Sequence, residues 1–137
     1  MRWLAIDPGT KRLGLAVGGQ EGAIASPVKT IPAEPRKAAL AAVKAIAADY
    51  GVAGIVVGLP INMDGTEGPQ ALHARALAAD VAAATGLEVR LHDERLSSFA
   101  ADRKLAGHMT RNKRRTRQDA IAAAEFLRDF LEGLGNP

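Results

Sequence analysis

The chain has 137 residues, a length that is enough for one domain (1–137) around one core. Its formal net charge is +3 and its pI is about 9.6. It has no cysteine, which excludes disulfides, thiolate chemistry and zinc–sulfur sites. No apolar run reaches the length of a membrane span and no secretion signal is evident, so we expect a cytoplasmic protein.

The apolar pattern predicts short strands first and then an alternation of helices and strands. Strands are expected over 2–7, 12–18 and 23–31, and Pro27 indicates that the third is an edge strand. Short links favour antiparallel pairing of these three, whereas later strands separated by helices favour parallel crossovers, giving an α/β fold. The later elements are expected as a helix over 34–49, a strand over 54–59, a helix over 69–85 and a strand over 87–92. A short helix from Ser97 or Ser98 to about Leu105 and a helix from Gln118 to about Leu131 are expected to follow. The helix over 69–85 has four apolar residues roughly on one side: Leu72, Leu77, Val81 and Ala84.

The basic residues are concentrated in one segment. Between Arg103 and Arg117 there is no acidic residue, and the rest of the chain carries a net charge of −4. We expect a mobile basic loop over 107–116 that binds phosphate groups, although such a run can also be a solvated surface. Its basic residues, with those flanking it, are Arg103, Lys104, Arg111, Lys113, Arg114, Arg115 and Arg117.

Two acidic residues follow apolar strands. Asp7 ends the first strand, just before a Pro-Gly turn, and ligand sites in α/β sheets gather beyond the carboxyl ends of strands. The alternative is that Asp7 only caps that turn. Glu94 follows the strand over 87–92, and strand alternation sends Asp93 and Glu94 to opposite faces, so only one can point into a site. Glu94 is preferred with Asp93 in reserve, and the alternative is that the two adjacent acids and Arg95 form a surface pair.

A third acidic residue, Asp119, opens the last predicted helix. Helical spacing places it on one face with Ala123, Phe126 and Phe130, so its carboxylate heads an apolar stripe. Interaction with the helix dipole in a first turn explains an acid there, but not its place on the buried face.

Three carboxylates that converge repel one another unless a cation lies between them. Ligand sets made only of oxygen suit Mg²⁺ or Mn²⁺. With a basic segment nearby, the natural substrate is a phosphodiester. Lys11 and Arg12 could neutralise its phosphate, and Gly9 and Gly14 would keep the first hairpin slim enough for a phosphate to approach.

Four stretches of the chain resemble the YqgF/RuvX family of ribonuclease-H-like proteins, which are related to Holliday junction resolvases and described as pre-16S rRNA nucleases. The stretches are Ile6-Asp-Pro-Gly-Thr-Lys-Arg-Leu-Gly-Leu-Ala16, Val57-Gly-Leu-Pro-Ile-Asn-Met-Asp-Gly-Thr-Glu67, His92-Asp-Glu-Arg-Leu-Ser-Ser98 and Gln118-Asp-Ala-Ile-Ala-Ala-Ala124. The resemblance implies a ribonuclease H fold with a five-stranded mixed sheet of order 3-2-1-4-5. It also implies metal-dependent phosphodiester hydrolysis in 5′-end processing of 16S rRNA, with pre-ribosomal particles as partners. By match, Asp7, Glu94 and Asp119 fall on the acidic positions of the family.

The chain departs from the wider resolvase pattern at one position. Related resolvases place an acid or a histidine three residues before the last aspartate, where this chain has Thr116. One ion held by Asp7 and Asp119 would activate water, and a second held by Asp7 and Glu94 would stabilise the leaving oxygen. Lys11, Arg95 and the arginines of the basic segment would hold flanking phosphates.

Three alternatives remain open from the sequence. The substrate could be branched DNA rather than RNA. The chain could also be a ribosome-assembly protein that binds nucleic acid without cleaving it, although binding a polyanion would be better served by losing the acids. The Asp7-Pro-Gly-Thr-Lys turn also resembles that of actin-like and sugar-kinase ATPases, which need two such domains to enclose ATP.

Overall fold

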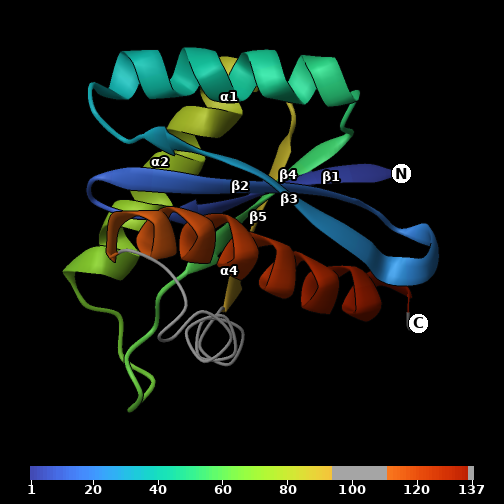
Figure 1. Cartoon of the computed structure of the whole chain (residues 1–137). Coiled ribbons are helices and arrows are strands. Elements are labelled where there is room, and N and C mark those ends of the chain that lie inside the picture. Colours follow the sequence, from blue (N-terminus) through green and yellow to red (C-terminus); the bar gives the residue numbers. More distant parts are fainter. Residues whose placement is uncertain (94–110, 136–137) are drawn as a thin grey trace.

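The computed structural model describes residues 1–93 and 111–135, with side chains of the last helix described from 119 to 134 (Figure 1). No helix within these ranges is long and apolar enough to cross a membrane. The elements are β1 (Arg2–Pro8), β2 (Arg12–Gly19), η1 (Glu21–Ala23), β3 (Ile24–Pro32), α1 (Arg36–Tyr50), β4 (Gly54–Leu59), α2 (Pro69–Thr85), β5 (Glu88–Asp93) and α4 (Arg111–Gly135).

The five strands form one sheet of order β3-β2-β1-β4-β5, which confirms the predicted order. β2 pairs antiparallel with both β1 and β3, whereas β4 pairs parallel with β1 and β5. The strand over Trp3–Ile6 is buried on both faces, as its continuous apolar sequence predicts. In the β1–β2 register, Asp7 lies opposite Gly14.

The helices cover the two faces of the sheet unequally. α1 and α2 lie on one face, and α4 runs across the other (Figure 1). Alternate residues of β1 supply the two cores: Leu4 and Ile6 pack toward α1 and α2, and Trp3 and Ala5 pack toward α4. A residue's place in the alternation of a strand therefore tells which helix its side chain faces.

The last helix is longer than its predicted range. α4 begins at Arg111 rather than at Gln118, so the prediction of a loop up to Thr116 is wrong for 111–116. The segment contains no glycine or proline, and Arg, Lys and Gln are good helix formers, so a cluster of charge does not interrupt the helix. Residues 107–110 and the predicted short helix after Ser97 or Ser98 lie outside the described residues.

The packing face of α2 also differs from the prediction. Leu72 is 63% exposed, and the helix is buried instead through Leu77, Val81 and three alanines, Ala71, Ala74 and Ala78. Alanines allow the helix to approach its neighbours closely, so α2 packs through the face that carries them, and Leu72 is left exposed. The exposed leucine lies one turn from the start of α2.

Candidate functional site

A cleft of about 440 Å³ lies where the β1–β2 turn meets the starts of α2 and the described part of α4. The turn contributes one wall, α2 contributes another, and α4 contributes an acidic residue. The lining residues are Pro8, Gly9, Thr10, Lys11, Arg12, Gln70, His73 and Asp119. The cleft thus brings together residues that are far apart in the sequence and combines two cations, one carboxylate, an amide and an imidazole.

The backbone of α4 packs directly on β2 at one glycine. A Cβ atom on Gly14 would collide with the backbone carbonyl of Asp119, so only glycine leaves room for this approach. The prediction that Gly14 makes space for a phosphate is wrong, because the backbone of Asp119 occupies that space. Gly14 instead fixes the position of Asp119 over the sheet.

Asp7 faces the same side of the sheet as Asp119. Cross-strand partners point to one face, and Gly14, the partner of Asp7, points at Asp119. Alternation along β1 gives the same result, since Trp3 and Ala5 pack toward α4. The structure therefore brings the predicted residues Asp7 and Asp119 together at the carboxyl end of β1.

Asp119 is held by Arg12, whose Nε lies 3.1 Å from the Oδ2 atom of Asp119. Both side chains are partly buried, at 33% and 26% exposure. Arg12 was expected at a substrate phosphate, and here it neutralises a carboxylate of the cleft. Because α4 begins at Arg111, Asp119 lies beyond the first helical turn, where the helix dipole is weak. Dipole complementation therefore does not explain this acid.

The end of β5 separates its polar residues by face. His92 stacks on Phe126 of α4 and its Nε2 lies 2.8 Å from Oδ2 of Asp129, so it faces α4. Asp93 is the register partner of Leu59, whose side chain packs into the core under α1 and α2. Asp93 therefore points away from Asp7 and Asp119. Glu94 and Arg95 lie outside the described residues.

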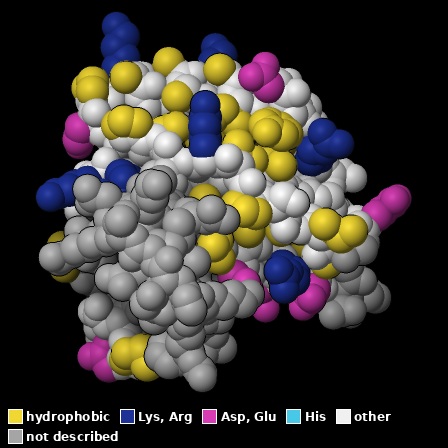
Figure 2. All heavy atoms as spheres, viewed as in Figure 1, with side chains coloured by type: hydrophobic (Ala, Val, Ile, Leu, Met, Phe, Trp, Pro, Cys, Tyr) yellow, Lys and Arg dark blue, Asp and Glu magenta, His cyan; other side chains and the backbone are white. Residues whose placement is uncertain are grey.

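The predicted phosphate-binding residues fall in three places. Lys11 and Arg12 line the cleft. Arg103 and Lys104 lie outside the described residues. Five basic residues lie on the first two turns of α4, where the backbone alone is described: Arg111, Lys113, Arg114, Arg115 and Arg117. On the face shown in Figure 2, most of the described Lys and Arg side chains are separated from one another by other residues.

The oxygen donors of the cleft suit a small divalent cation. Within the described ranges there is no group of three or more His, Cys, Asp or Glu residues that could hold a metal ion by themselves. Mg²⁺, however, is commonly bound through one or two carboxylates together with waters and substrate phosphates. Asp119 lines the cleft, and Asp7 lies on the same face of the sheet at the end of β1, so these two carboxylates are groups of the kind that such a cation binds.

Sequence reasoning missed Gln70 and His73. Both lie in the first turns of α2 and line the cleft from the side opposite Asp119. Their spacing of three residues places them on one helix face, and they follow a polar loop, which is the signal that could have found them. The spacing does not predict which segment lies across the cleft from Gln70 and His73, because only the fold brings α2 next to the β1–β2 turn.

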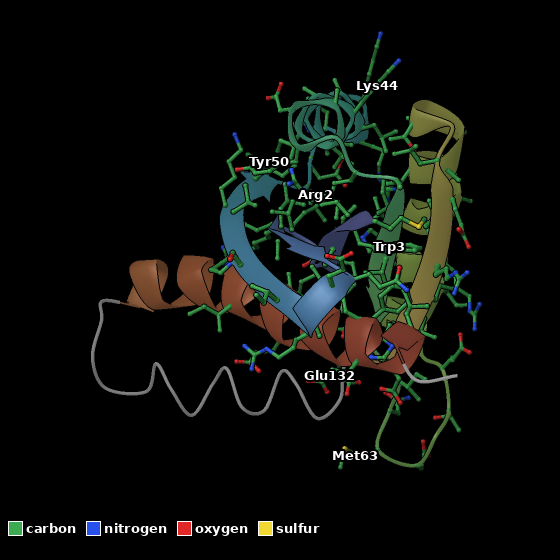
Figure 3. The ribbon with its side chains drawn as sticks, turned by 90° about the vertical axis from the view of Figure 1, so that its right-hand side faces the viewer. Arg2, Trp3, Lys44, Tyr50, Met63 and Glu132 are labelled. Carbon is green, nitrogen blue, oxygen red and sulfur yellow. The ribbon has the colours of Figure 1, made fainter. Side chains whose placement is uncertain are left out.

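The loop over 60–68, between β4 and α2, is held by its own hydrogen bonds. The backbone N–H of Asn62 donates to the carbonyl of Thr66 (2.9 Å), and the hydroxyl and N–H of Thr66 donate to Asp64 (2.6 and 3.0 Å). These bonds hold the pKa of Asp64 below its ordinary value, the hydroxyl bond contributing most. Met63, 89% exposed, projects from the body at the tip of this loop (Figure 3).

The base of the same loop is fixed by an ion pair. Arg75 of α2 donates from Nε and Nη2 to the two oxygens of Glu67 (2.6 and 2.8 Å), and this bond lowers the pKa of Glu67. The bidentate geometry ties the loop to the helix that carries Gln70 and His73. The wall of the cleft formed by α2 is therefore connected to an ordered loop.

Residues 1–133 match the model of a protein family described as RuvX, Holliday junction resolvase. Relatives from Anaeromyxobacter carry the name "Putative pre-16S rRNA nuclease". One from strain Fw109-5 is 42% identical over 134 residues, covering 97% of this chain and 98% of the relative. One from A. dehalogenans strain 2CP-1 is 45% identical over 133 residues, covering 96% and 97%.

Solved structures of low sequence identity share the fold. RuvC of T. thermophilus, in complex with a Holliday junction substrate, matches with a TM-score of 0.59 at 18% identity, over 99% of this chain and 96% of that chain. Fowlpox virus resolvase, in complex with Holliday junction DNA, matches with a TM-score of 0.58 at 13% identity, over 98% and 99%. The predicted ribonuclease-H-like fold is thereby confirmed.

Proposed function

The chain belongs to the RuvX family, and from that premise we propose that it is a metal-dependent nuclease that hydrolyses phosphodiester bonds in 5′-end processing of pre-16S rRNA. One observation carries the proposal: the packing of α4 on Gly14 brings Asp119 to the face and strand end where Asp7 lies. Neighbouring carboxylates destabilise a fold by mutual repulsion and loss of hydration, and a cation bound between them removes that repulsion. We propose the cytoplasm as the site of action and a single domain over 1–137.

Asp7 and Asp119 are proposed as ligands of Mg²⁺ or Mn²⁺, with Glu94 as a third. Glu94 is proposed because strand alternation, extended one residue beyond Asp93, predicts the face opposite that of Asp93. When bound, the cation supplies charge stabilisation at the phosphoryl oxygens and activation of the attacking water. The carboxylates fix its place, and their position on a strand and a long helix keeps that place rigid.

The remaining groups of the cleft are proposed to hold the nucleic acid. Lys11 and Arg12 provide positive charge on the turn, and Gln70 and His73 provide hydrogen-bonding groups on the opposite wall. Phosphate contacts fix the register of a backbone without reading its sequence. Further phosphate contacts are proposed for Arg95, Arg111, Lys113, Arg114, Arg115 and Arg117.

A second candidate function is resolution of Holliday junctions or other branched DNA. It is favoured by the family description and by the likeness of the whole chain to RuvC bound to a junction. A third candidate is a nucleic-acid-binding assembly factor without catalysis. The names of the relatives support the rRNA substrate over the junction.

One experiment separates the three candidates. Purified protein is incubated with 5′-extended 16S precursor RNA and, separately, with a four-way DNA junction, in Mg²⁺ or Mn²⁺ and in chelator. We expect cleavage of the RNA at its 5′ side, no cleavage in chelator, and no cleavage by Asp7→Asn. Cleavage of the junction alone would favour the resolvase, and binding without cleavage across both metals and a range of pH would favour the assembly factor.

A further inference from the structure

Arg12 occupies an unusual place for a residue on a substrate-binding turn, because it faces both the cleft and a carboxylate of the cleft. Its Nε lies 3.1 Å from Oδ2 of Asp119, and its side chain is one-third exposed. Arg12 also lines the cleft beside Lys11. A lone pair of Asp119 Oδ2 that accepts from Arg12 cannot also bind a cation, so Arg12 competes with a cation that binds through this oxygen.

The backbone of Arg12 is fixed while its side chain can change partners. Arg12 begins β2 and pairs with Pro32 of β3, and the N–H of Ala33 donates to the carbonyl of the preceding Lys11 at 2.9 Å. The pairing with β3, and the pairing of the next residue, Leu13, with Pro8 of β1, anchor the Cα atom of Arg12 at the rim of the cleft. A long side chain on such an anchor reaches Asp119 in one rotamer and open cleft in others.

We propose that Arg12 is a resident counter-ion of Asp119 that gives up this carboxylate when a divalent cation binds and then contacts a substrate phosphate. The inference rests on the proposed metal site. Without metal, Arg12 offsets the repulsion between Asp119 and Asp7. With metal, the guanidinium is released into the cleft beside Lys11, and a phosphate is its best available partner. Metal binding and nucleic-acid binding are therefore coupled through one side chain.

A positioning role makes the opposite prediction. If Arg12 only orients Asp119 as a ligand, its removal weakens metal binding, as loss of a supporting hydrogen bond does at other metal sites. If Arg12 competes with the metal, its removal tightens metal binding. A partly exposed ion pair changes an equilibrium constant by up to about fivefold. The sign of the change in metal affinity separates the two roles.

The test measures Mn²⁺ affinity without any activity readout. Free Mn²⁺ is followed by electron paramagnetic resonance in titrations of the wild type, Arg12→Gln, Asp119→Asn and a control, Arg36→Gln. Arg36 forms an equivalent pair with Asp80, at 2.8 Å, on the α1–α2 side of the molecule. We expect Arg12→Gln to bind Mn²⁺ up to about fivefold more tightly than the wild type, and Arg36→Gln to bind like the wild type.

A second measurement tests the release of Arg12. Binding of a single-stranded oligoribonucleotide is measured by fluorescence anisotropy with and without Mn²⁺, at an ionic strength that is held constant. Coupling is reciprocal, so Mn²⁺ should strengthen RNA binding by the wild type more than by Arg12→Gln. Thermal unfolding in chelator confirms that each variant is folded, and Arg12→Lys replaces Arg12→Gln if the latter is not.

The outcomes separate the inference from the function on which it rests. Unchanged or weaker Mn²⁺ binding by Arg12→Gln, with Asp119→Asn clearly impaired, overturns the counter-ion role and leaves the metal site intact. Equal Mn²⁺ binding by the wild type and Asp119→Asn removes the metal site, and the inference with it. An equal effect of Mn²⁺ on RNA binding in the wild type and Arg12→Gln overturns the release of Arg12.

Discussion

Gly14 and Asp119 are 105 positions apart in the sequence, yet the backbone carbonyl of Asp119 lies where a side chain on Gly14 would begin. This contact sets how closely α4 approaches β2, and it therefore sets the distance from Asp119 to Asp7, the strand partner of Gly14. The absence of one Cβ atom thus determines the geometry of the candidate site.

Replacing Gly14 with alanine should therefore push α4 away from the sheet. Overpacking of this kind costs about 1–3 kcal/mol, so urea unfolding should show a loss of stability of that size, together with weaker Mn²⁺ binding. Gly19→Ala is the matched control, because it lies on the same strand with open space around its Cβ position. Equal stability of the two variants would show that α4 adjusts without strain.

Asp119→Asn should remove cleavage of RNA while leaving the fold intact. A partly exposed ion pair contributes about 0–1 kcal/mol, so the stability change should be small. Cleavage should fall by more than about 100-fold, since even the supporting partners of metal ligands have effects of 10–100-fold. RNA binding should persist or strengthen as negative charge leaves the cleft. Asp80→Asn, which breaks the Arg36 pair, should cleave like the wild type, and an active Asp119→Asn would contradict the role of Asp119.

Arg114→Ala combined with Arg115→Ala should weaken RNA binding for all sequences. Each phosphate contact on a single strand contributes about −0.7 to the slope of log affinity against log salt, so two contacts should flatten it by about 1.4. The control replaces Lys37 and Lys44, which are exposed on α1, on the far face of the sheet from α4 (Figure 3). A slope that matches that of the control pair would mean that the start of α4 is a solvated surface.

The loop that carries Met63 should lose its internal order in acid. Because hydrogen bonds from Thr66 lower the pKa of Asp64 in the folded state, they contribute stability that is complete above its ordinary pKa. That contribution is lost as the pH falls through the lowered folded pKa. Thr66→Val removes the larger of the two bonds and should raise the pKa of Asp64, measured from carboxyl carbon shifts by NMR.

Glu67 provides an internal control for that titration. Its pKa is lowered by the bond from Arg75 rather than by Thr66. Arg75→Gln should therefore raise the pKa of Glu67 and leave that of Asp64 in place. If the pKa values of Asp64 and Glu67 both change in either variant, the loop titrates as one unit and the two bonds are not independent.

The sequence predicts the sheet and one face of the last helix because these depend on local periodicity. The strands and the stripe headed by Asp119 are confirmed, with Ala123 and Phe126 fully buried and Phe130 nearly so, and the strand order, which the family resemblance implied, is confirmed as well. The start of α4 is not predicted, since a run of charge suggests a loop whereas the intrinsic preference of Arg and Lys favours a helix.

The site is predicted only in part, because its key contacts join distant segments. Asp7 and Asp119 stand out locally as acids in apolar surroundings, but the pairing of Arg12 with Asp119 depends on how α4 crosses β2. Gln70 and His73 share a helix face after a polar loop, but that local signal does not show which segment lies opposite them across the cleft. The register of β5 with β4 places Asp93 on the face away from Asp7 and Asp119, whereas Glu94 lies outside the described residues.

The helix that carries Asp119 also covers the smaller of the two hydrophobic cores. Phe126, Leu127 and Leu131 of α4 are fully buried, and Phe130 packs edge-on against Trp3 with ring centroids 4.9 Å apart. Fraying from the C-terminal end of α4 must expose these side chains before it reaches Asp119, so from that end the site and this core open together. Amide hydrogens from Ala123 to Leu131 should then exchange at the rate of global unfolding, and variants that loosen the core at Trp3 should also weaken the site.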